Sequence, residues 1–197
     1  MKKLVFATSN ENKIREIREI LSGMDFEVIT MKEAGLDMDI VEDGKTFEEN
    51  ALIKARAVAE ASGEIAVADD SGLEIDYLGK EPGIYSARYL GHDTSYDYKN
   101  SVILERLEGV PDEERTARFV CAVAVVFPDG SSKTFVHTME GQIGYEIAGQ
   151  NGFGYDPIFF LPEYGKTSAE ISPEEKNAIS HRGKALRALA EYLKETK

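Results

Sequence analysis

The stretch EIAVADDSGLEID (residues 64–76) places two carboxylates directly after an apolar run. Residues 65–68 have the apolar, partly β-branched character of a buried strand. Asp69 and Asp70 follow side by side before Ser71 and Gly72, and a simple polar turn is the alternative interpretation of these residues. Adjacent carboxylates repel each other, and the pKa of one should rise unless a cation lies between them. The stretch therefore predicts a strand that ends in an acidic site and needs a positive charge.

Such a site would suit a hard divalent cation. Open α/β sheets bind ligands at the carboxyl ends of their strands, where this strand would deliver its acidic pair. Mg²⁺ is normally held by one or two protein carboxylates together with substrate phosphates. Glu42, in the acidic stretch DMDIVEDG (37–44), is the candidate second ligand beside Asp70, although a solvated acidic loop would give the same pattern. We therefore expect Mg²⁺ as the cofactor, bound by Glu42 and Asp70.

Composition bounds the class of protein. The 197 residues are 42% hydrophobic and 30% charged, which predicts one large domain, or one domain with two lobes, around a sizeable core. A formal net charge of −13 disfavours nucleic acid and anionic membranes as partners. A single cysteine, Cys121, excludes an internal disulfide framework and is expected in the core. Because neither a signal peptide nor an apolar run of ~20 residues is present, we expect a cytoplasmic protein.

Strand and helix patterns alternate along the chain. The alternation, followed by a hairpin at PDGSSK (128–133), predicts an α/β domain with a mixed sheet. Whether residues 180–183 interrupt the last helix is left open by the pattern. The expected elements are strands at 3–8, 65–68 and 119–127, and helices that start after residues 9–10, run from 46 to 63 and from 96 to 107, start at the capping box of 172–175, and cover 184–195.

The first strand-to-helix turn is a candidate phosphate site. Thr8, Ser9, Asn10, Glu11, Asn12 and Lys13 bring hydroxyls, amides and backbone N–H groups to a helix start, where the helix dipole favours an anion. Lys13 is unfavourable in a first helical turn unless it serves a ligand, but an ordinary N-cap with a solvated lysine is the alternative. Neither GKT sequence, at 44–46 or 165–167, has the earlier glycine of a P-loop.

The segment NGFGYDP (151–157) is a candidate base-binding site. Its glycines permit close backbone approach, and an aromatic ring can stack on a flat base for about 1–3 kcal/mol. A tight turn with aromatic rings in the core would have the same composition. Lys176, His181 and Arg182 lie on or beside a helix, where a solvated face is the plain interpretation.

Five separated motifs, in one order, resemble the inosine/xanthosine triphosphate pyrophosphatase family. The resemblance runs nearly end to end, whereas the related Maf-type pyrophosphatases are not expected to contain the last two motifs. It implies an elongated, strongly twisted mixed sheet flanked by helices, a single domain over 1–197 with two lobes around a central cleft, and commonly a homodimer. The motifs are TSNENK (8–13), ADDSGL (68–73), PGIYSARY (82–89), GFGYDPIF (152–159) and EEKNAISHRGKAL (174–186).

The resemblance also implies roles for single residues. Asp70 matches the proposed proton acceptor and, with Glu42, the Mg²⁺ ligands, while Asp69 matches a neighbour of the metal site and Arg88 is chosen on charge alone. Thr8 to Lys13 and Lys54 match phosphate contacts, and Ser71 matches a substrate contact. The matches around the purine and phosphates are Phe153, Gly154, Tyr155, Asp156, Lys176, His181 and Arg182.

The implied reaction is hydrolysis of ITP, dITP or XTP to the monophosphate and pyrophosphate, which removes non-standard purines from the nucleotide pool. Donors from His181, Arg182 and backbone N–H groups would recognise the 6-oxo group, while Tyr155 or Phe153 stacks on the ring. Two alternatives stay open: a Maf-like pyrophosphatase with another base preference, and a nucleotide-binding sensor without turnover. The order of preference among the three substrates is not visible in the sequence.

Overall fold

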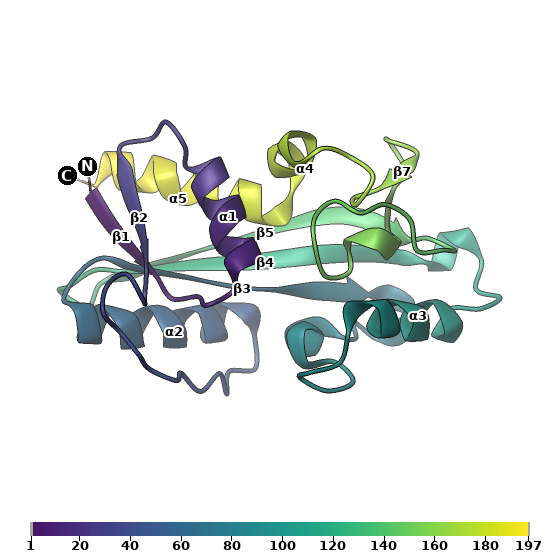
Figure 1. The fold of residues 1–197 in the computed structure, drawn as a ribbon, viewed down its shortest axis with the longest axis horizontal. Helices are drawn as coiled ribbons and strands as arrows, with labels where there is room; N and C mark the ends of the chain where they lie inside the picture. The colour runs from purple at the N-terminus through teal and green to yellow at the C-terminus, as the bar shows by residue number, and fades with distance from the viewer. Residues whose placement is uncertain (1, 197) are drawn as a thin grey trace. The chain divides into compact units, whose positions relative to one another are not determined.

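The computed structural model describes residues 2–196 and contains a mixed α/β sheet (Figure 1). Within these residues seven strands form one sheet in the order β2-β1-β3-β4-β5-β6-β7. β1 pairs in parallel with β2 and β3, whereas β6 pairs antiparallel with β5 and β7. The predicted mixed sheet is thus confirmed. The strands are β1 (Lys2–Phe6), β2 (Phe26–Thr30), β3 (Ala66–Ile75), β4 (Thr116–Val126), β5 (Ser132–Ile143), β6 (Phe159–Leu161) and β7 (Lys166–Thr167).

Five α-helices are described, together with four short 3₁₀ turns. Asn10 caps the first helix and Ser172 the fourth, as the sequence predicts. The fourth helix ends at Ile179, and Ser180 is extended, so the chain does break before the last helix. The helices are α1 (Glu11–Ile20), α2 (Phe47–Ser62), α3 (Tyr96–Arg106), α4 (Pro173–Ile179) and α5 (His181–Glu195), and the turns are η1 (Asp76–Leu78), η2 (Gly83–Arg88), η3 (Asp112–Glu114) and η4 (Asp156–Ile158).

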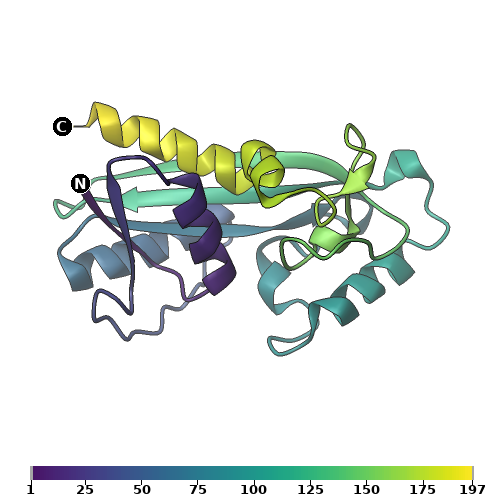
Figure 2. The ribbon, with the colours of Figure 1, turned by 45° about the horizontal axis from the view of Figure 1, so that its top comes forward.

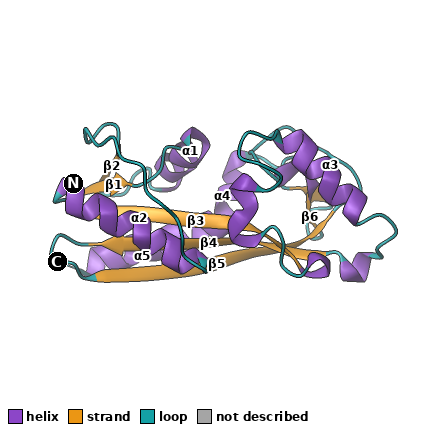
Figure 3. Cartoon of the chain, turned by 90° about the horizontal axis from the view of Figure 1, so that it is seen from below, coloured by secondary structure: helices purple, strands orange, loops and turns teal. Residues whose placement is uncertain are grey.

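The chain divides into two compact units. The first unit comprises Met1–Asp70, Cys121–His137 and His181–Lys197, and the second comprises Ser71–Val120 and Thr138–Ser180. The long strands β3, β4 and β5, which are neighbours in the sheet (Figure 3), each contribute residues to both units. The single domain predicted over 1–197 stays a prediction, and residues 1 and 197 lie outside the described range.

The first unit buries its core on both faces of its strands. Leu4 and Phe6 of β1 join Val67 of β3, Cys121 of β4, and apolar side chains of α1 and α5 in one cluster. Val5 points the other way, because side chains alternate along a strand, and it is also fully buried. Figures 1 and 2 show α1 and α5 against one face of these strands, while α2 covers the opposite face in Figure 1.

Helix α2 matches its predicted limits. Thr46 caps its first turn by accepting from the backbone N–H of Glu49 at 3.1 Å. Gly63 closes it in the left-handed conformation, with φ of 68°, which glycine adopts without strain. The apolar side of the helix carries Ala51, Ala55 and Val58, all fully buried. These small residues let the helix approach the sheet closely.

The second unit has its own core under α3. Leu73 and Ile75 of β3 pack with Ile103 of α3, Phe119 of β4 and Tyr155 of the segment before η4. The prediction that the strand ends at its acidic pair is therefore wrong. β3 continues through Asp69 and Asp70 to Ile75, because the alternation of Leu73 and Ile75 supplies buried side chains to this second core.

Among residues 2–196, no helix is both long enough and apolar enough to cross a lipid bilayer.

Candidate active site

The acidic pair lies inside β3, where neighbouring side chains point to opposite faces of the sheet. Asp69 is 1% exposed and Asp70 9% exposed. Asp69 meets side chains of α1 and α5, whereas Asp70 interacts with Lys54 of α2 and Glu42 of the loop before it. The two carboxylates therefore have different surroundings although they are adjacent in sequence.

Asp69 is held as an anion by fixed cations. Its Oδ2 lies 3.0 Å from Nζ of Lys13 and 3.4 Å from Nη2 of Arg182. Burial alone would raise the pKa of Asp69, but the charges of Lys13, Arg182 and Lys54 outweigh burial and hold the pKa well below its usual range. Asp69 is consequently a poor proton acceptor.

Asp70 has the opposite character. Its Oδ2 is buried and has no hydrogen-bond partner within residues 2–196. Burial raises the pKa of Asp70 to about 6, helped by the nearby charges of Glu42 and Asp69 and opposed by those of Lys54 and Lys13. The sequence predicts that one member of the acidic pair has a raised pKa, and the structure assigns that rise to Asp70.

Lys54 connects α2 to the acidic pair. Its Nζ donates to the backbone carbonyl of Asp69 at 2.7 Å and forms an ion pair with Oε1 of Glu42. Burial lowers the pKa of Lys54, but the charges of Asp69, Asp70 and Glu42 outweigh burial and raise the pKa above its usual value. Lys54 therefore stays a cation, and the structure brings it together with Glu42 and Asp70.

Arg182 is the most deeply placed cation of the first unit. It is 2% exposed, and besides Asp69 it forms an ion pair with Glu16 of α1. His181, its neighbour at the start of α5, is buried as well. Glu16 was missed by sequence reasoning, although its place one turn after Lys13 on a face that also carries Ile17 was a usable signal. The predicted roles of His181 and Arg182 at the purine stay predictions.

The predicted phosphate turn is a regular helix cap. Oδ1 of Asn10 accepts from the backbone N–H groups of Asn12 at 3.0 Å and of Lys13 at 3.2 Å. Oγ1 of Thr8 accepts from the N–H of Asn10 at 3.1 Å. Ser9, Glu11 and Asn12 are exposed, so of this turn the structure brings the Lys13 side chain to the acidic pair. Phosphate binding by the turn stays a prediction.

The charged side chains around the acidic pair leave an excess of negative charge. Four carboxylates face three cations here: Glu16, Glu42, Asp69 and Asp70 against Lys13, Lys54 and Arg182. No group of three or more histidine, cysteine or acidic side chains within residues 2–196 is arranged to hold a metal by itself. Two carboxylates, one with an unpartnered buried oxygen, nevertheless fit Mg²⁺, which takes its remaining ligands from water and phosphate.

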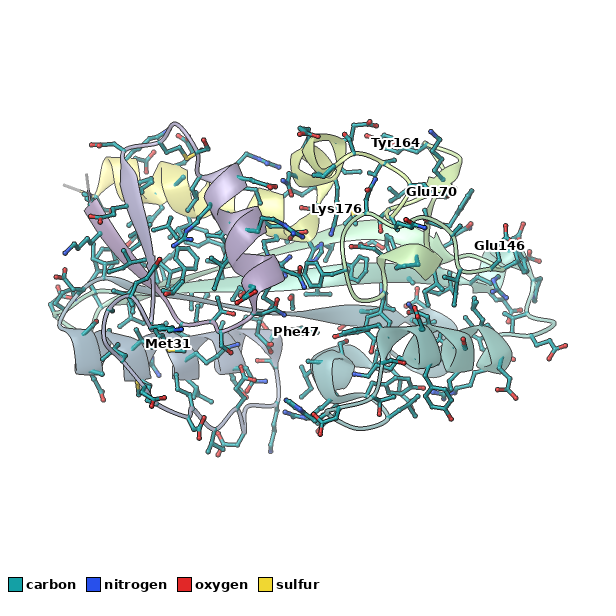
Figure 4. All side chains as sticks on the ribbon, in the orientation of Figure 1. Met31, Phe47, Glu146, Tyr164, Glu170 and Lys176 are labelled. Atoms are coloured by element: carbon teal, nitrogen blue, oxygen red, sulfur yellow. The ribbon has the colours of Figure 1, made fainter. Side chains whose placement is uncertain are left out.

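The second unit contains a separate buried cluster around Asp156. Its Oδ2 accepts from Nζ of Lys176 at 2.7 Å and from the backbone N–H of Phe153 at 2.9 Å, and its Oδ1 accepts from Oγ of Ser168 at 2.6 Å. Lys176, labelled on α4 in Figure 4, has its Nζ 5.1 Å from the centre of the Phe153 ring. The structure thus brings three predicted residues, Phe153, Asp156 and Lys176, together and adds Ser168, which lies in no motif.

A glycine and a side-chain hydrogen bond hold this cluster in place. Gly152 has φ of 69°, and a Cβ there would overlap Oδ2 of Asp156, so a side chain is excluded on both grounds. Asn100 of α3 donates from Nδ2 to the carbonyl of Gly154 at 3.1 Å. The segment that presents Phe153 is therefore fixed from inside the second unit.

Tyr155 belongs to the core of this unit. It is 4% exposed, its hydroxyl donates to the carbonyl of Ser86 at 2.6 Å, and its ring meets Tyr96 edge to face at 5.2 Å. Phe153 keeps partial exposure, so it is the better placed of the two rings to stack on a base.

The structure also places the two remaining predicted residues. Ser71 follows Asp70 on β3. Arg88 stacks on the exposed ring of Tyr85, with its Cζ 4.9 Å from the ring centre.

Comparison with known proteins then decides the family. The sequence pattern of the Ham1 family matches residues 4–192. The chain belongs to the Ham1 family. A protein of Clostridium perfringens named dITP/XTP pyrophosphatase is 47% identical over 200 residues, which cover 98% of each chain. A Bacillus subtilis protein of the same name is 47% identical over 193 residues, again with 98% of each chain covered.

The fold of the Ham1 family is also known from solved structures. The Ham1 protein of Staphylococcus aureus matches this chain with a TM-score of 0.89 and 42% identity, and the match covers 100% of both chains. The resemblance and the fold class, a twisted mixed sheet flanked by helices, are thus confirmed. The individual site residues are not tested by these matches, and their roles stay predictions.

Proposed function

We propose that this Ham1 family chain hydrolyses non-canonical purine nucleoside triphosphates, namely dITP, ITP and XTP, to the monophosphate and pyrophosphate. Its nearly full-length relatives carry the name dITP/XTP pyrophosphatase. The structural observation that supports the proposal is the Asp70 carboxylate, buried, with one unpartnered oxygen and two lysines nearby. Removal of such nucleotides would keep them out of the pool of precursors.

Glu42 and Asp70 are the residues that would hold Mg²⁺. When bound there, Mg²⁺ would supply positive charge that offsets the adjacent carboxylates and the phosphate oxygens. In the cluster around the acidic pair, carboxylates outnumber cations by one, and this supports the assignment because a bound cation would relieve the excess charge. Asp69, whose Oδ2 pairs with Lys13 and Arg182, would stabilise these two cations rather than take part directly.

Asp70 would act as the proton acceptor. In the metal-free chain burial raises the pKa of Asp70 to about 6, so this carboxylate is more basic than an ordinary aspartate and is still largely ionised at neutral pH. A water molecule attacks the α-phosphorus, its proton passes to the Asp70 carboxylate, and the bond to the leaving pyrophosphate breaks. Asp69 could not replace Asp70, because its cation partners hold its pKa too low.

The lysines would bind the triphosphate. Lys13 and Lys54 carry charge at the acidic pair and could neutralise the negative charge that grows on pyrophosphate. Thr8, Ser9, Asn10, Glu11 and Asn12 would line the phosphates next to Lys13, and Ser71 would contact the substrate beside Asp70. The catalysis is then mainly electrostatic, with one proton transfer.

Phe153 and its supporting residues belong to the second unit and would contact the purine ring. Phe153 would stack on the ring, and Asp156 with Lys176 would hold the segment from residue 153 to 156 in place. Hypoxanthine and xanthine carry a 6-oxo acceptor where adenine carries an amino donor. Donors such as His181 and Arg182 aimed at this oxygen would leave adenine with unpaired or opposed polar groups.

Two further parts of the proposal concern the location and the oligomeric state of the protein. We place the enzyme in the cytoplasm, where its triphosphate substrates are found. We also propose a homodimer, in line with the family resemblance. Size measurement in solution tests the second part directly.

Product analysis tests the proposed function. Purified protein is incubated with dITP, XTP, dGTP, ATP and dTTP, with Mg²⁺ or with chelator, and the products are separated. We expect pyrophosphate and monophosphate from dITP and XTP only with Mg²⁺. The Asp70→Asn variant should form neither product. Orthophosphate would indicate another reaction, a preference for dTTP or dGTP would favour the Maf-like alternative, and binding without products would favour the sensor.

A further inference from the structure

The sheet-facing side of α2 carries two polar side chains one turn apart, Asn50 and Lys54. Asn50 is 2% exposed, and its Oδ1 accepts from the backbone N–H of Gly44 at 2.9 Å. Lys54 forms the ion pair with Glu42. The loop that carries Glu42 is thus attached to α2 both through its backbone at Gly44 and through the carboxylate itself.

The backbone attachment requires close contact between loop and helix. A Cβ on Gly44 would lie 2.6 Å from Oδ1 of Asn50 and 2.8 Å from Cβ of Glu49. Just beyond, the N–H of Lys45 donates to Oε2 of Glu49 at 2.6 Å. The loop therefore lies directly against the start of α2, the end at which Figure 4 labels Phe47.

We propose that Asn50 is a positioning residue that fixes the 42–44 segment on α2 and so places the Glu42 carboxylate for the metal. The inference rests on the proposed function, in which Glu42 is a ligand of Mg²⁺. A carboxylate on an exposed loop loses orientation, whereas one tied to a helix keeps it, and outer contacts of this kind control metal affinity. Asn50 touches neither metal nor substrate in this role.

The first test measures the attachment without any ligand. Asn50→Leu keeps the side-chain size and removes the acceptor, so the Gly44 amide should exchange with deuterium about 10-fold faster in metal-free protein. Asn50→Asp keeps an oxygen acceptor and should preserve the protection. Val58→Ala, also on the buried side of α2 and about two turns further along, is the control for general loosening of the helix. Equal Gly44 exchange in Asn50→Leu and Val58→Ala would overturn the proposal.

The second test measures the metal dependence of pyrophosphate release. In Asn50→Leu the Mg²⁺ concentration for half-maximal rate should rise about 10-fold, while the rate at saturating Mg²⁺ stays within about 2-fold of the unmodified chain. Val58→Ala should keep the original Mg²⁺ dependence. An unchanged Mg²⁺ dependence in Asn50→Leu, or the same change in Val58→Ala, would contradict the assigned role.

A second variant covers the case in which Asn50→Leu does not fold. Gly44→Ala leaves Asn50 intact and pushes the 42–44 segment off the helix. The amide of residue 44 should then exchange faster, and the Mg²⁺ concentration for half-maximal rate should rise. A folded Gly44→Ala variant with unchanged exchange and unchanged Mg²⁺ dependence would overturn the proposal. The proposed function fails separately, if the unmodified chain releases no pyrophosphate. In that case Gly44 exchange still decides whether Asn50 holds the loop.

Discussion

Nζ of Lys13 lies 3.0 Å from Oδ2 of Asp69, and the same carboxylate oxygen is 3.4 Å from Arg182. A single acid of β3 therefore pairs with cations from two helices, α1 and α5, which pack on one face of the first unit. Each of these ions is largely removed from water, so the charges depend on one another. Asp69 is therefore the counter-charge that stabilises the half-buried Lys13 and the buried Arg182.

Replacing Asp69 by asparagine should accordingly destabilise the fold. We expect Asp69→Asn to lower the free energy of unfolding by about 3 kcal/mol, because Lys13 and Arg182 lose a buried counter-charge. Urea denaturation of metal-free protein measures this change. Asp39→Asn, in the exposed acidic segment, is the matched control and should change the free energy by less than about 0.5 kcal/mol. Equal stability of the two variants would show that the pair contributes little.

Asp70→Asn should have the opposite effect on stability, and the effect should depend on pH. The pKa of Asp70 is raised from 3.8 in the unfolded chain to about 6 in the fold, so folding favours its protonated form. The contribution of the Asp70 carboxyl to the free energy of unfolding is fully present below about pH 4 and is lost as pH rises through about 6. Asparagine does not ionise, so metal-free Asp70→Asn should be more stable than the unmodified chain by up to about 3 kcal/mol at pH 7.5.

Denaturation at pH 4.5 and pH 7.5 in the presence of chelator checks this prediction. The difference between the two proteins isolates Asp70, since all other groups are shared. A difference that is the same at both pH values would mean that Asp70 titrates normally. At neutral pH the same variant should lack pyrophosphatase activity, so a gain in stability would accompany a loss of function.

The local elements of this fold were predictable because their signals are local. Thr46 and Gly63 mark the two ends of α2 through side-chain capping and a positive φ, and neither depends on distant parts of the chain. The end of β3 was not predictable in the same way. Two charged residues interrupt its apolar pattern, and the strand continues only because Leu73 and Ile75 find a second core.

The candidate site shows the same division. Asp70 and Glu42 could be proposed from residue chemistry and spacing, and Lys54 from the family resemblance. The position of Glu16 beside Ile17 on α1 was a usable signal, but its pairing with Arg182 was not predictable, because Arg182 lies far along the chain and only tertiary packing joins them. Asn50 was missed for a related reason, since its hydrogen bond to a loop N–H leaves no pattern in the sequence.

Lys54 should be needed for turnover. Lys54→Gln removes the cation that contacts Glu42 and the carbonyl of Asp69, so kcat/KM for dITP should fall about 100-fold. Lys54→Arg should recover little of this loss, because a planar guanidinium cannot replace a compact ammonium at a buried site. Lys45→Gln, an exposed lysine of the preceding loop, should leave kcat/KM unchanged. A similar loss in both glutamine variants would indicate a general effect of net charge.

Lys176 and Asp156 should prove strongly coupled in the second unit. Both side chains are nearly fully buried at a distance of 2.7 Å, so Lys176→Met should lower the free energy of unfolding by about 3 kcal/mol by leaving Asp156 with a poorly compensated charge. Adding Asp156→Asn removes that charge while keeping an oxygen for the N–H of Phe153, and should restore at least about 1.5 kcal/mol. Urea denaturation of the single and double variants measures the coupling. If the losses of unfolding free energy in the two single variants simply add in the double variant, the ion pair contributes little. If the double variant regains stability but has a raised KM for dITP, the pair has a second part, which is to hold Phe153 for the purine.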